Sequence, residues 1–159
     1  MPPLIFGNEI FDRLTAEARA IARKRKNLNF HSSADFPAHR FLNAMEPESY
    51  SQPHRHLEPN KDETFVVLRG RFGLLLFDDK GNITTRAILG PGFDAVGANV
   101  PAGRFHCLVS LEAGSVFMEA KAGPYNPITD KDWAPWAPNE EHPGAQAYLD
   151  ILKREFPLP

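Results

Sequence analysis

Residues 53–70 read PHRHLEPNKDETFVVLRG and bring two histidines and a carboxylate into one short stretch. His54 and His56 are two residues apart, and on a β-strand that spacing puts two side chains on the same face, about 6.5–7 Å apart. Arg55 would then point away from them. Glu63 begins the next apolar run, so a hairpin loop would place its carboxylate beside the two imidazoles. The stretch predicts two adjacent strands that aim nitrogen and oxygen ligands at one point.

A second stretch, residues 101–110 (PAGRFHCLVS), supplies a third histidine. Its Pro-Ala-Gly start is typical of a turn, and His106 opens the apolar run that follows. A His-x-His pair alone is weak evidence for a metal site, because most histidines lie on the surface or are hydrogen-bonded. The joint pattern of two strands and a turn is much stronger evidence. It predicts one divalent metal ion held by His54, His56, Glu63 and His106.

Composition limits the class of protein. The 159 residues suit one domain, and 42% of them are apolar, enough for a core. No apolar run approaches the roughly 18 residues of a membrane span, and the first residues lack the features of a secretory signal. One cysteine, Cys107, excludes an internal disulfide framework and fits a reducing compartment. The net charge of −2 gives no reason to expect a nucleic-acid partner. We therefore expect a cytoplasmic protein with neither a membrane nor a nucleic-acid partner.

The residue pattern predicts one helix near each end and short strands between them. Residues 14–26 have an apolar stripe and a capping residue, Thr15. A second helix is expected at residues 145–155. Between them, short runs of β-formers alternate with turn residues, which is typical of a sandwich or barrel. The expected strands are residues 38–45, 49–56, 63–68, 71–78, 83–89, 94–96, 106–110 and 115–121.

Arg19 and the basic run Arg23-Lys24-Arg25-Lys26 have two interpretations. Cations in the last turn of a helix interact favourably with the helix dipole, and this is the interpretation we favour. The alternative is a patch that contacts phosphate groups.

Both histidine stretches resemble the two motifs of the cupin superfamily. The first motif is His-x-His, a few residues, Glu, six residues and Gly, and the chain has His54, His56, Glu63 and Gly70. The gap between His56 and Glu63 is longer than usual, which brings Glu58 into consideration, but the six residues before Gly70 favour Glu63. The second motif, Pro-x-Gly-x-x-His followed by Asn, matches residues 101–110 except that Ser110 replaces the Asn. The resemblance implies a mainly β jelly-roll barrel (double-stranded β-helix) with an N-terminal and a short C-terminal helix.

A narrower resemblance covers most of the chain. The segments RFLNAMEPESYSQPHRH, KDETFVVLRG, FDDKGN, KAGPYNP and WAPWAP look like the WbuC family of cupin-fold metalloproteins. That family is associated with polysaccharide biosynthesis loci, which implies a small-molecule substrate such as a carbohydrate. We accordingly expect residues 1–30 to form a helical extension, residues 31–122 the barrel, and residues 123–159 a proline- and tryptophan-rich tail packed on it, within a single domain.

Strand parity predicts which side chains line the cavity. With His54 inward, Tyr50 and Gln52 would point inward too, and Leu108 and Ser110 would share the inner face of the strand of His106. Cys107 would face the other way, as buried packing. Glu119 and Tyr50 are candidate acid/base groups, although an exposed face on an edge strand is a slightly better interpretation of Glu119.

The tail carries aromatic residues with two interpretations. Trp133 and Trp136 either cover the barrel, which we favour, or form a wall of the ligand pocket, and Tyr125 has the same two alternatives.

Three imidazoles and one carboxylate leave coordination positions open on zinc or iron, the metals we favour, or on manganese or nickel. Three functions are consistent with such a site: a sugar or nucleotide-sugar isomerase or epimerase, an Fe(II)-dependent oxygenase, and a non-catalytic metal-dependent binding protein. Because an exposed sheet edge favours pairing, we also expect a homodimer.

Overall fold

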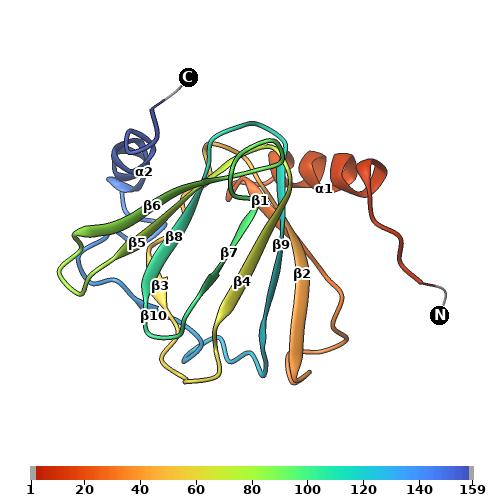
Figure 1. Cartoon of the computed structure of the whole chain (residues 1–159), viewed down its shortest axis with the longest axis horizontal. Coiled ribbons are helices and arrows are strands. Elements are labelled where there is room, and N and C mark those ends of the chain that lie inside the picture. The colour runs from red at the N-terminus through yellow and green to blue at the C-terminus, as the bar shows by residue number, and fades with distance from the viewer. Residues whose placement is uncertain (1–2, 158–159) are drawn as a thin grey trace.

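The structure is a computed structural model that describes residues 3–157. Its elements in chain order are α1 (Asn8–Ala20), β1 (Arg25–Asn29), β2 (Ala38–Met45), β3 (His54–Arg55), β4 (Glu63–Arg69), β5 (Phe72–Phe77), β6 (Ile83–Leu89), β7 (Gly97–Val100), β8 (Phe105–Ser110), β9 (Ser115–Ala122), β10 (Asp132–Trp133) and α2 (Ala145–Lys153). Two five-stranded antiparallel sheets face each other, with strand orders β1-β2-β9-β4-β7 and β10-β3-β8-β5-β6 (Figure 1). The expected jelly-roll barrel with a helix near each end is confirmed.

Alternation along the strands separates the interior of the barrel from its outer faces. On β5, Phe72 and Leu74 point between the sheets, whereas Leu75 and Phe77 point outward. The interior is a buried apolar cluster contributed by both sheets: Met45, Phe65, Val67, Phe72, Leu74, Leu89, Val100, Leu108 and Phe117. This cluster fills one part of the barrel, and the polar residues described below occupy another part.

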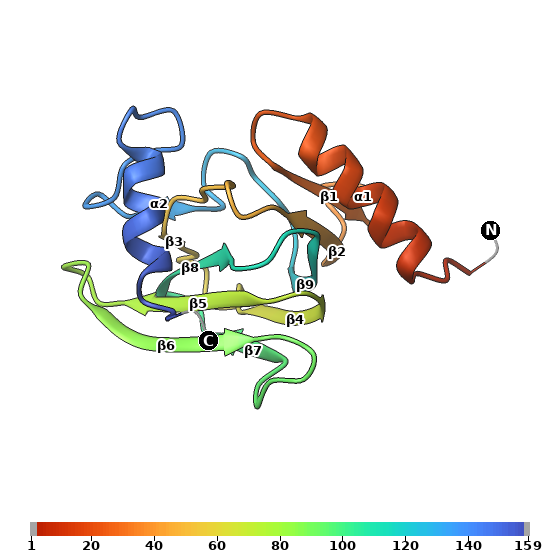
Figure 2. The same cartoon turned by 90° about the horizontal axis from the view of Figure 1, so that it is seen from above.

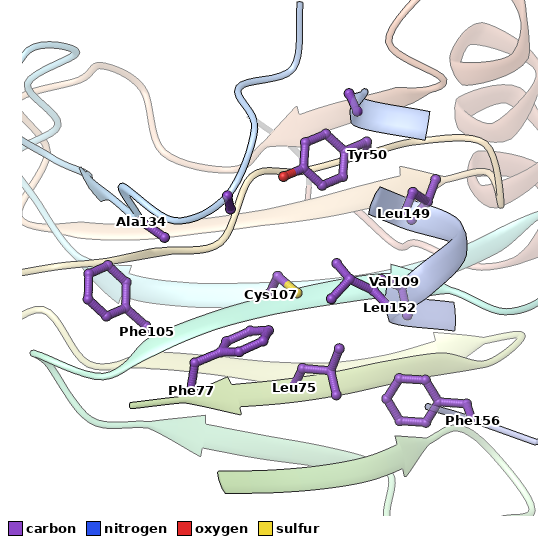
Figure 3. Close-up of a cluster of buried hydrophobic side chains, with 12 residues drawn as sticks. Tyr50, Leu75, Phe77, Phe105, Cys107, Val109, Ala134, Leu149, Leu152 and Phe156 are labelled. Carbon is purple, nitrogen blue, oxygen red and sulfur yellow. The ribbon is translucent and has the colours of Figure 1, made fainter. Parts of the chain in front are cut away.

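The two helices lie on opposite flanks of the barrel (Figure 2). Helix α1 packs Phe11, Leu14 and Ala18 on the outer face of the first sheet, against Leu42 and Val116. Helix α2 and the chain after it pack on the outer face of the second sheet. Figure 3 shows the resulting cluster, in which Leu149, Leu152 and Phe156 of the tail lie with Tyr50, Cys107 and Val109.

The expected N-terminal helix is displaced in the structure. It runs from Asn8 to Ala20 rather than over residues 14–26, and Thr15 lies inside it, donating a hydrogen bond to the carbonyl of Phe11 instead of capping it. The backbone becomes extended at Ile21, and residues 25–29 pair with β2. Pairing with a sheet has overridden the helical preference of this segment. Arg19 does lie in the last turn of α1, as our favoured interpretation expects, but the run of residues 23–26 follows the helix, so for the run that interpretation was wrong.

Two expected strands also differ. The strand expected at residues 49–56 is reduced to His54–Arg55, and the one expected at residues 94–96 is replaced by Gly97–Val100. The short strand β10 in the tail was not expected. Among residues 3–157, no helix combines the length and the apolar character needed to cross a membrane. The proposed limits of the barrel at residues 31 and 122 stay a prediction.

Candidate metal centre

Three of the four expected ligands meet between the sheets. His54 and His106 lie opposite each other on the neighbouring strands β3 and β8, and Glu63 approaches from β4 of the facing sheet. One ligand atom from each residue lies within 4.8 Å of the other two, and all three side chains are buried. We refer to His54, Glu63 and His106 as the His–Glu cluster.

Hydrogen bonds fix the tautomers of the histidines. Nδ1 of His54 donates to the carbonyl of Gln52 (3.1 Å), and Nδ1 of His106 donates to the carbonyl of Arg104 (2.9 Å). A carbonyl oxygen only accepts, so in each ring Nδ1 carries the proton and Nε2 is left with a lone pair. Nε2 of His106 lies 2.7 Å from Oε2 of Glu63. Two electron-rich atoms this close repel each other unless a proton or a metal ion lies between them.

His56 stands beside the His–Glu cluster but is not a member of it. Its Nδ1 donates to the carbonyl of Asp130, and its Nε2 lies 3.0 Å from Oε1 of Glu63. The contact does not have the angles of a hydrogen bond, so this buried Nε2 has no hydrogen-bond partner among residues 3–157. A buried lone pair without a donor costs free energy, and coordination to a metal ion would satisfy it. Glu58, the alternative carboxylate, is half-exposed on the surface.

The charge state of the cluster also suits a metal. Burial lowers the pKa of His54 well below its ordinary value, and the positive charge of Lys131 adds to the effect, so His54 is neutral near pH 7. Burial alone would raise the pKa of Glu63. The contacts of its carboxylate with the rings of His106 and His56, together with the charge of Lys121, outweigh burial and hold that pKa well below its usual range. A neutral imidazole and an ionised carboxylate are the forms that bind metal ions, so these residues fit a divalent ion.

Behind the cluster lies a buried ion network that the sequence did not reveal. Nζ of Lys121 lies 3.1 Å from Glu63, 3.3 Å from Asp130 and 3.6 Å from Glu119. Nζ of Lys61 lies 2.8 Å from the other oxygen of Asp130, and both side chains are about 1% exposed. Burial would lower the pKa of Lys121, but the carboxylates raise it above its ordinary value. The two lysines compensate the negative charge of the carboxylates. They also hold Asp130 in place, whose backbone carbonyl orients the ring of His56.

Glu119 is a second inward carboxyl group. It lies on β9, which is a central strand, so the interpretation as an exposed edge was wrong. The side-chain amide of Asn43 donates to it at 3.2 Å. Burial, and next the negative charge of Glu63, raise the pKa of Glu119 well above its usual range.

A pocket of about 470 Å³ opens onto these groups. Its lining includes the His–Glu cluster, Glu119 and Lys121, and two of the expected cavity residues, Leu108 and Tyr125, also line it. Its apolar walls are Phe65, Phe117 and Met45. The volume is in the range of pockets that hold small organic ligands.

Other expected cavity residues lie elsewhere. Tyr50 packs in the outer cluster of α2, with its hydroxyl donating to the carbonyl of Pro138, and Gln52 donates to the carbonyls of Ala134 and Ala137. Because the chain before His54 is not a strand, the alternation that placed them inward does not apply. Ser110 is fully buried and donates to the carbonyl of Glu112.

The two tryptophans have separate environments. Trp136 covers the second sheet, where it contacts Phe77 and Phe105. Trp133 lies on β10 opposite His54, with the two rings 5.4 Å apart, and is 44% exposed. The tail thus covers the barrel with one tryptophan and places the other beside the His–Glu cluster.

Comparison with known protein families identifies one that matches this chain. A family model described as "Domain of unknown function (DUF6016)" matches residues 6–89, more than half of the chain. The chain belongs to the DUF6016 family. The match includes His54, His56 and Glu63 but ends before His106 and Glu119. No curated protein matches the sequence.

Solved structures show the fold of this DUF6016 protein to be that of the cupins. Similar folds occur in the capsular polysaccharide assembling protein CapF from Staphylococcus aureus (17% identity, TM-score 0.54) and in oxalate decarboxylase from Bacillus subtilis (17%, TM-score 0.50). Another is protein SO0799 from Shewanella oneidensis (14%, TM-score 0.52). The matches cover 67%, 69% and 67% of this chain, and 29%, 27% and 72% of those chains. The chain therefore spans less than a third of CapF and of the decarboxylase.

Proposed function

We propose that this protein is a metal-dependent enzyme of the cupin fold that isomerises or epimerises a sugar or nucleotide-sugar. The observation that carries the proposal is the position of the His–Glu cluster on a pocket that also contains a separate carboxyl group, Glu119. An acid/base group that does not ligate the metal is what proton transfer on a bound substrate needs.

The residues of the chain have distinct roles in this proposal. His54, Glu63 and His106, joined by His56, would hold the ion, which when bound supplies a Lewis acid for a substrate oxygen. Glu119 would take a proton from a carbon of the substrate and return it. Asn43 orients the carboxyl group of Glu119, and Lys121 keeps Glu63 ionised. The buried position of the cluster would exclude bulk water.

A carbohydrate substrate is supported by three further points. The chain resembles the WbuC family, which is associated with polysaccharide biosynthesis, and one protein of similar fold is described as assembling capsular polysaccharide. Phe65 and Phe117 also give the pocket aromatic surface, which suits the apolar face of a sugar ring. A homodimer and a cytoplasmic location stay part of the same proposal.

Elemental analysis of the purified protein tests the metal centre. We expect near-stoichiometric divalent metal in the wild type and its loss in a His54→Ala/His106→Ala double variant. His142→Ala is the matched control, because His142 is exposed and lies outside the pocket. Equal metal content in the double variant, or metal-free protein that takes up none on incubation, would contradict the proposal.

The metal and the turnover then distinguish the functions. Conversion of a nucleotide-sugar by zinc-, manganese- or nickel-loaded protein, lost in Glu119→Gln with metal content unchanged, is the result expected of an isomerase or epimerase. Iron in the purified protein and oxygen uptake linked to a substrate would instead identify an oxygenase, which the donor set of histidines and a carboxylate also suits.

A further inference from the structure

Lys131 is a cation at the pocket without a counter-ion. It lines the pocket together with His54, Glu63 and Glu119. Its Nζ lies 5.1 Å from the centre of the Trp133 ring and forms no hydrogen bond or ion pair with any residue in the range 3–157. The side chain is half-buried. An ammonium group taken partly out of water without a carboxylate beside it is unfavourable.

Of the other lysines and arginines that line the pocket, Lys26 also has no partner among residues 3–157, but it is exposed to water; the remaining three are paired. Lys121 lies within 4 Å of three carboxylates. Arg25 pairs with Glu140 and donates to Ser49 and to the carbonyl of Tyr50. Arg23 shares the same carboxylate of Glu140. The basic run is therefore largely engaged within the protein, and Lys131 is left with unused donors.

Lys131 is also close to the place where chemistry is proposed. The ring of Trp133 lies 5.4 Å from that of His54, and the ammonium group of Lys131 lies 5.1 Å from the centre of the same Trp133 ring. Lys131 and the His–Glu cluster line the same pocket, so a ligand that extends from the cluster along the pocket would meet Lys131.

We propose that Lys131 binds an oxyanion of the substrate, so that the pocket takes an acidic sugar carrying a carboxylate or a phosphate rather than a neutral sugar. That the ligand is a sugar rests on the proposed function. That it carries a negative charge rests on the unpaired ammonium group of Lys131. The oxyanion supplies the acceptors that Lys131 lacks, and a charged hydrogen bond of this kind contributes strongly when it is partly shielded from water.

Calorimetric titration tests the inference directly, with no need for turnover. The probes are glucuronate, glucose 6-phosphate and glucose, each titrated into wild type, Lys131→Met, Lys131→Arg and Lys26→Met at constant ionic strength. Lys26 is the matched control, since it is an exposed lysine that lines the same pocket and also has no partner in the described part of the chain. Circular dichroism and metal content establish that each variant is folded and loaded.

We expect at least one of the two acidic probes to bind more tightly than glucose, and its affinity to fall about tenfold or more in Lys131→Met. Lys131→Arg should retain part of the affinity, and Lys26→Met most of it. Tighter binding of glucuronate identifies a carboxylate, and tighter binding of glucose 6-phosphate identifies a phosphate.

Several results would overturn the inference: unchanged affinity in Lys131→Met, an equal loss in Lys26→Met, glucose binding as tightly as the acids, or no binding of any probe. These are distinguishable from failure of the proposed function. Normal metal content without preference for acidic probes rejects the role of Lys131 alone. Selective binding of an acid by protein that holds no metal rejects the metal centre and retains Lys131.

Discussion

At the scale of single residues, the centre depends on buried charges that stabilise one another. Asp130 is the shared partner of Lys61 and Lys121, and its backbone carbonyl also accepts the hydrogen bond of His56. Burial would raise the pKa of Asp130, but the two lysines hold it below its ordinary value, so the residue is ionised at neutral pH. Removing this one charge leaves two buried cations short of a partner.

We therefore predict that Asp130→Asn lowers the free energy of unfolding by about 3–5 kcal/mol, the usual cost of breaking a buried pair from one side. Urea unfolding at neutral pH with a chelator present measures it, so that loss of metal does not contribute. Asp79→Asn is the control, because Asp79 pairs with Arg55 but is 84% exposed. Its expected effect is within about 0.5 kcal/mol, and equal effects of the two variants would contradict the prediction.

The sequence predicted the cluster but not the network, for a physical reason. His54, Glu63 and His106 belong to local motifs whose spacing matches the geometry of strands and turns. Lys61 and Asp130 meet only because the tail folds back onto the barrel. Nothing in the sequence near either residue indicates that the two are in contact. Tyr50 and Gln52 were misplaced because alternation holds only while a strand continues, and β3 has two residues.

At the scale of elements, helix α2 holds the tail on the barrel. Leu149 and Leu152 face the outer side of β5 and β8, whereas Ile151 on the same helix is 52% exposed. Gly73 on β5 leaves the space for the ring of Phe156, since a methyl group there would lie 2.3 Å from the ring. The tail that carries Lys131 and Trp133 is thus held in place by apolar contacts on the far side of the sheet.

Leu149→Ala should lower the free energy of unfolding by about 2–5 kcal/mol, because it removes a fully buried side chain and leaves a cavity. Ile151→Ala should cost less than about 1 kcal/mol. Chemical denaturation of both variants measures the difference. If the two substitutions had the same effect, the packing of α2 on the barrel would not be what stabilises the tail.

Strands with their own burial pattern were predictable from the sequence, whereas a strand that depends on a distant partner was not. The strands 38–45, 63–68 and 115–121 were predicted within a residue or two, because each carries its own pattern of buried side chains. Arg25 and Lys26 were expected to end a helix, but they belong to the edge strand Arg25–Asn29, which forms because β2 offers it hydrogen bonds. Such a choice depends on a partner that lies elsewhere in the chain.

At the scale of the whole molecule, two buried phenols make stability depend on pH. Burial raises the pKa of Tyr148 to about 12, with a smaller contribution from Cys107, and burial raises that of Tyr50 as well. The rings of Tyr50 and Tyr148 meet edge to face at 6.0 Å, where α2 packs on the barrel. In the unfolded chain a phenol ionises near its ordinary value of about 10. Between these values the folded protein binds more protons than the unfolded chain, so stability falls as pH rises.

We predict that the stabilisation from Tyr148 is complete below about pH 10 and lost by about pH 12, amounting to about 1–2 kcal/mol after allowance for solvent screening. Urea midpoints measured from pH 8 upward test this, with Tyr148→Phe as the comparison. The variant should lose less stability with rising pH, because phenylalanine has no proton to release and no longer adds to the raised pKa of Tyr50. Absorbance of phenolate provides the second measurement. A tyrosine signal complete near pH 10 in the folded protein, or identical pH dependence in Tyr148→Phe, would mean that the packing of the tail does not shield Tyr148.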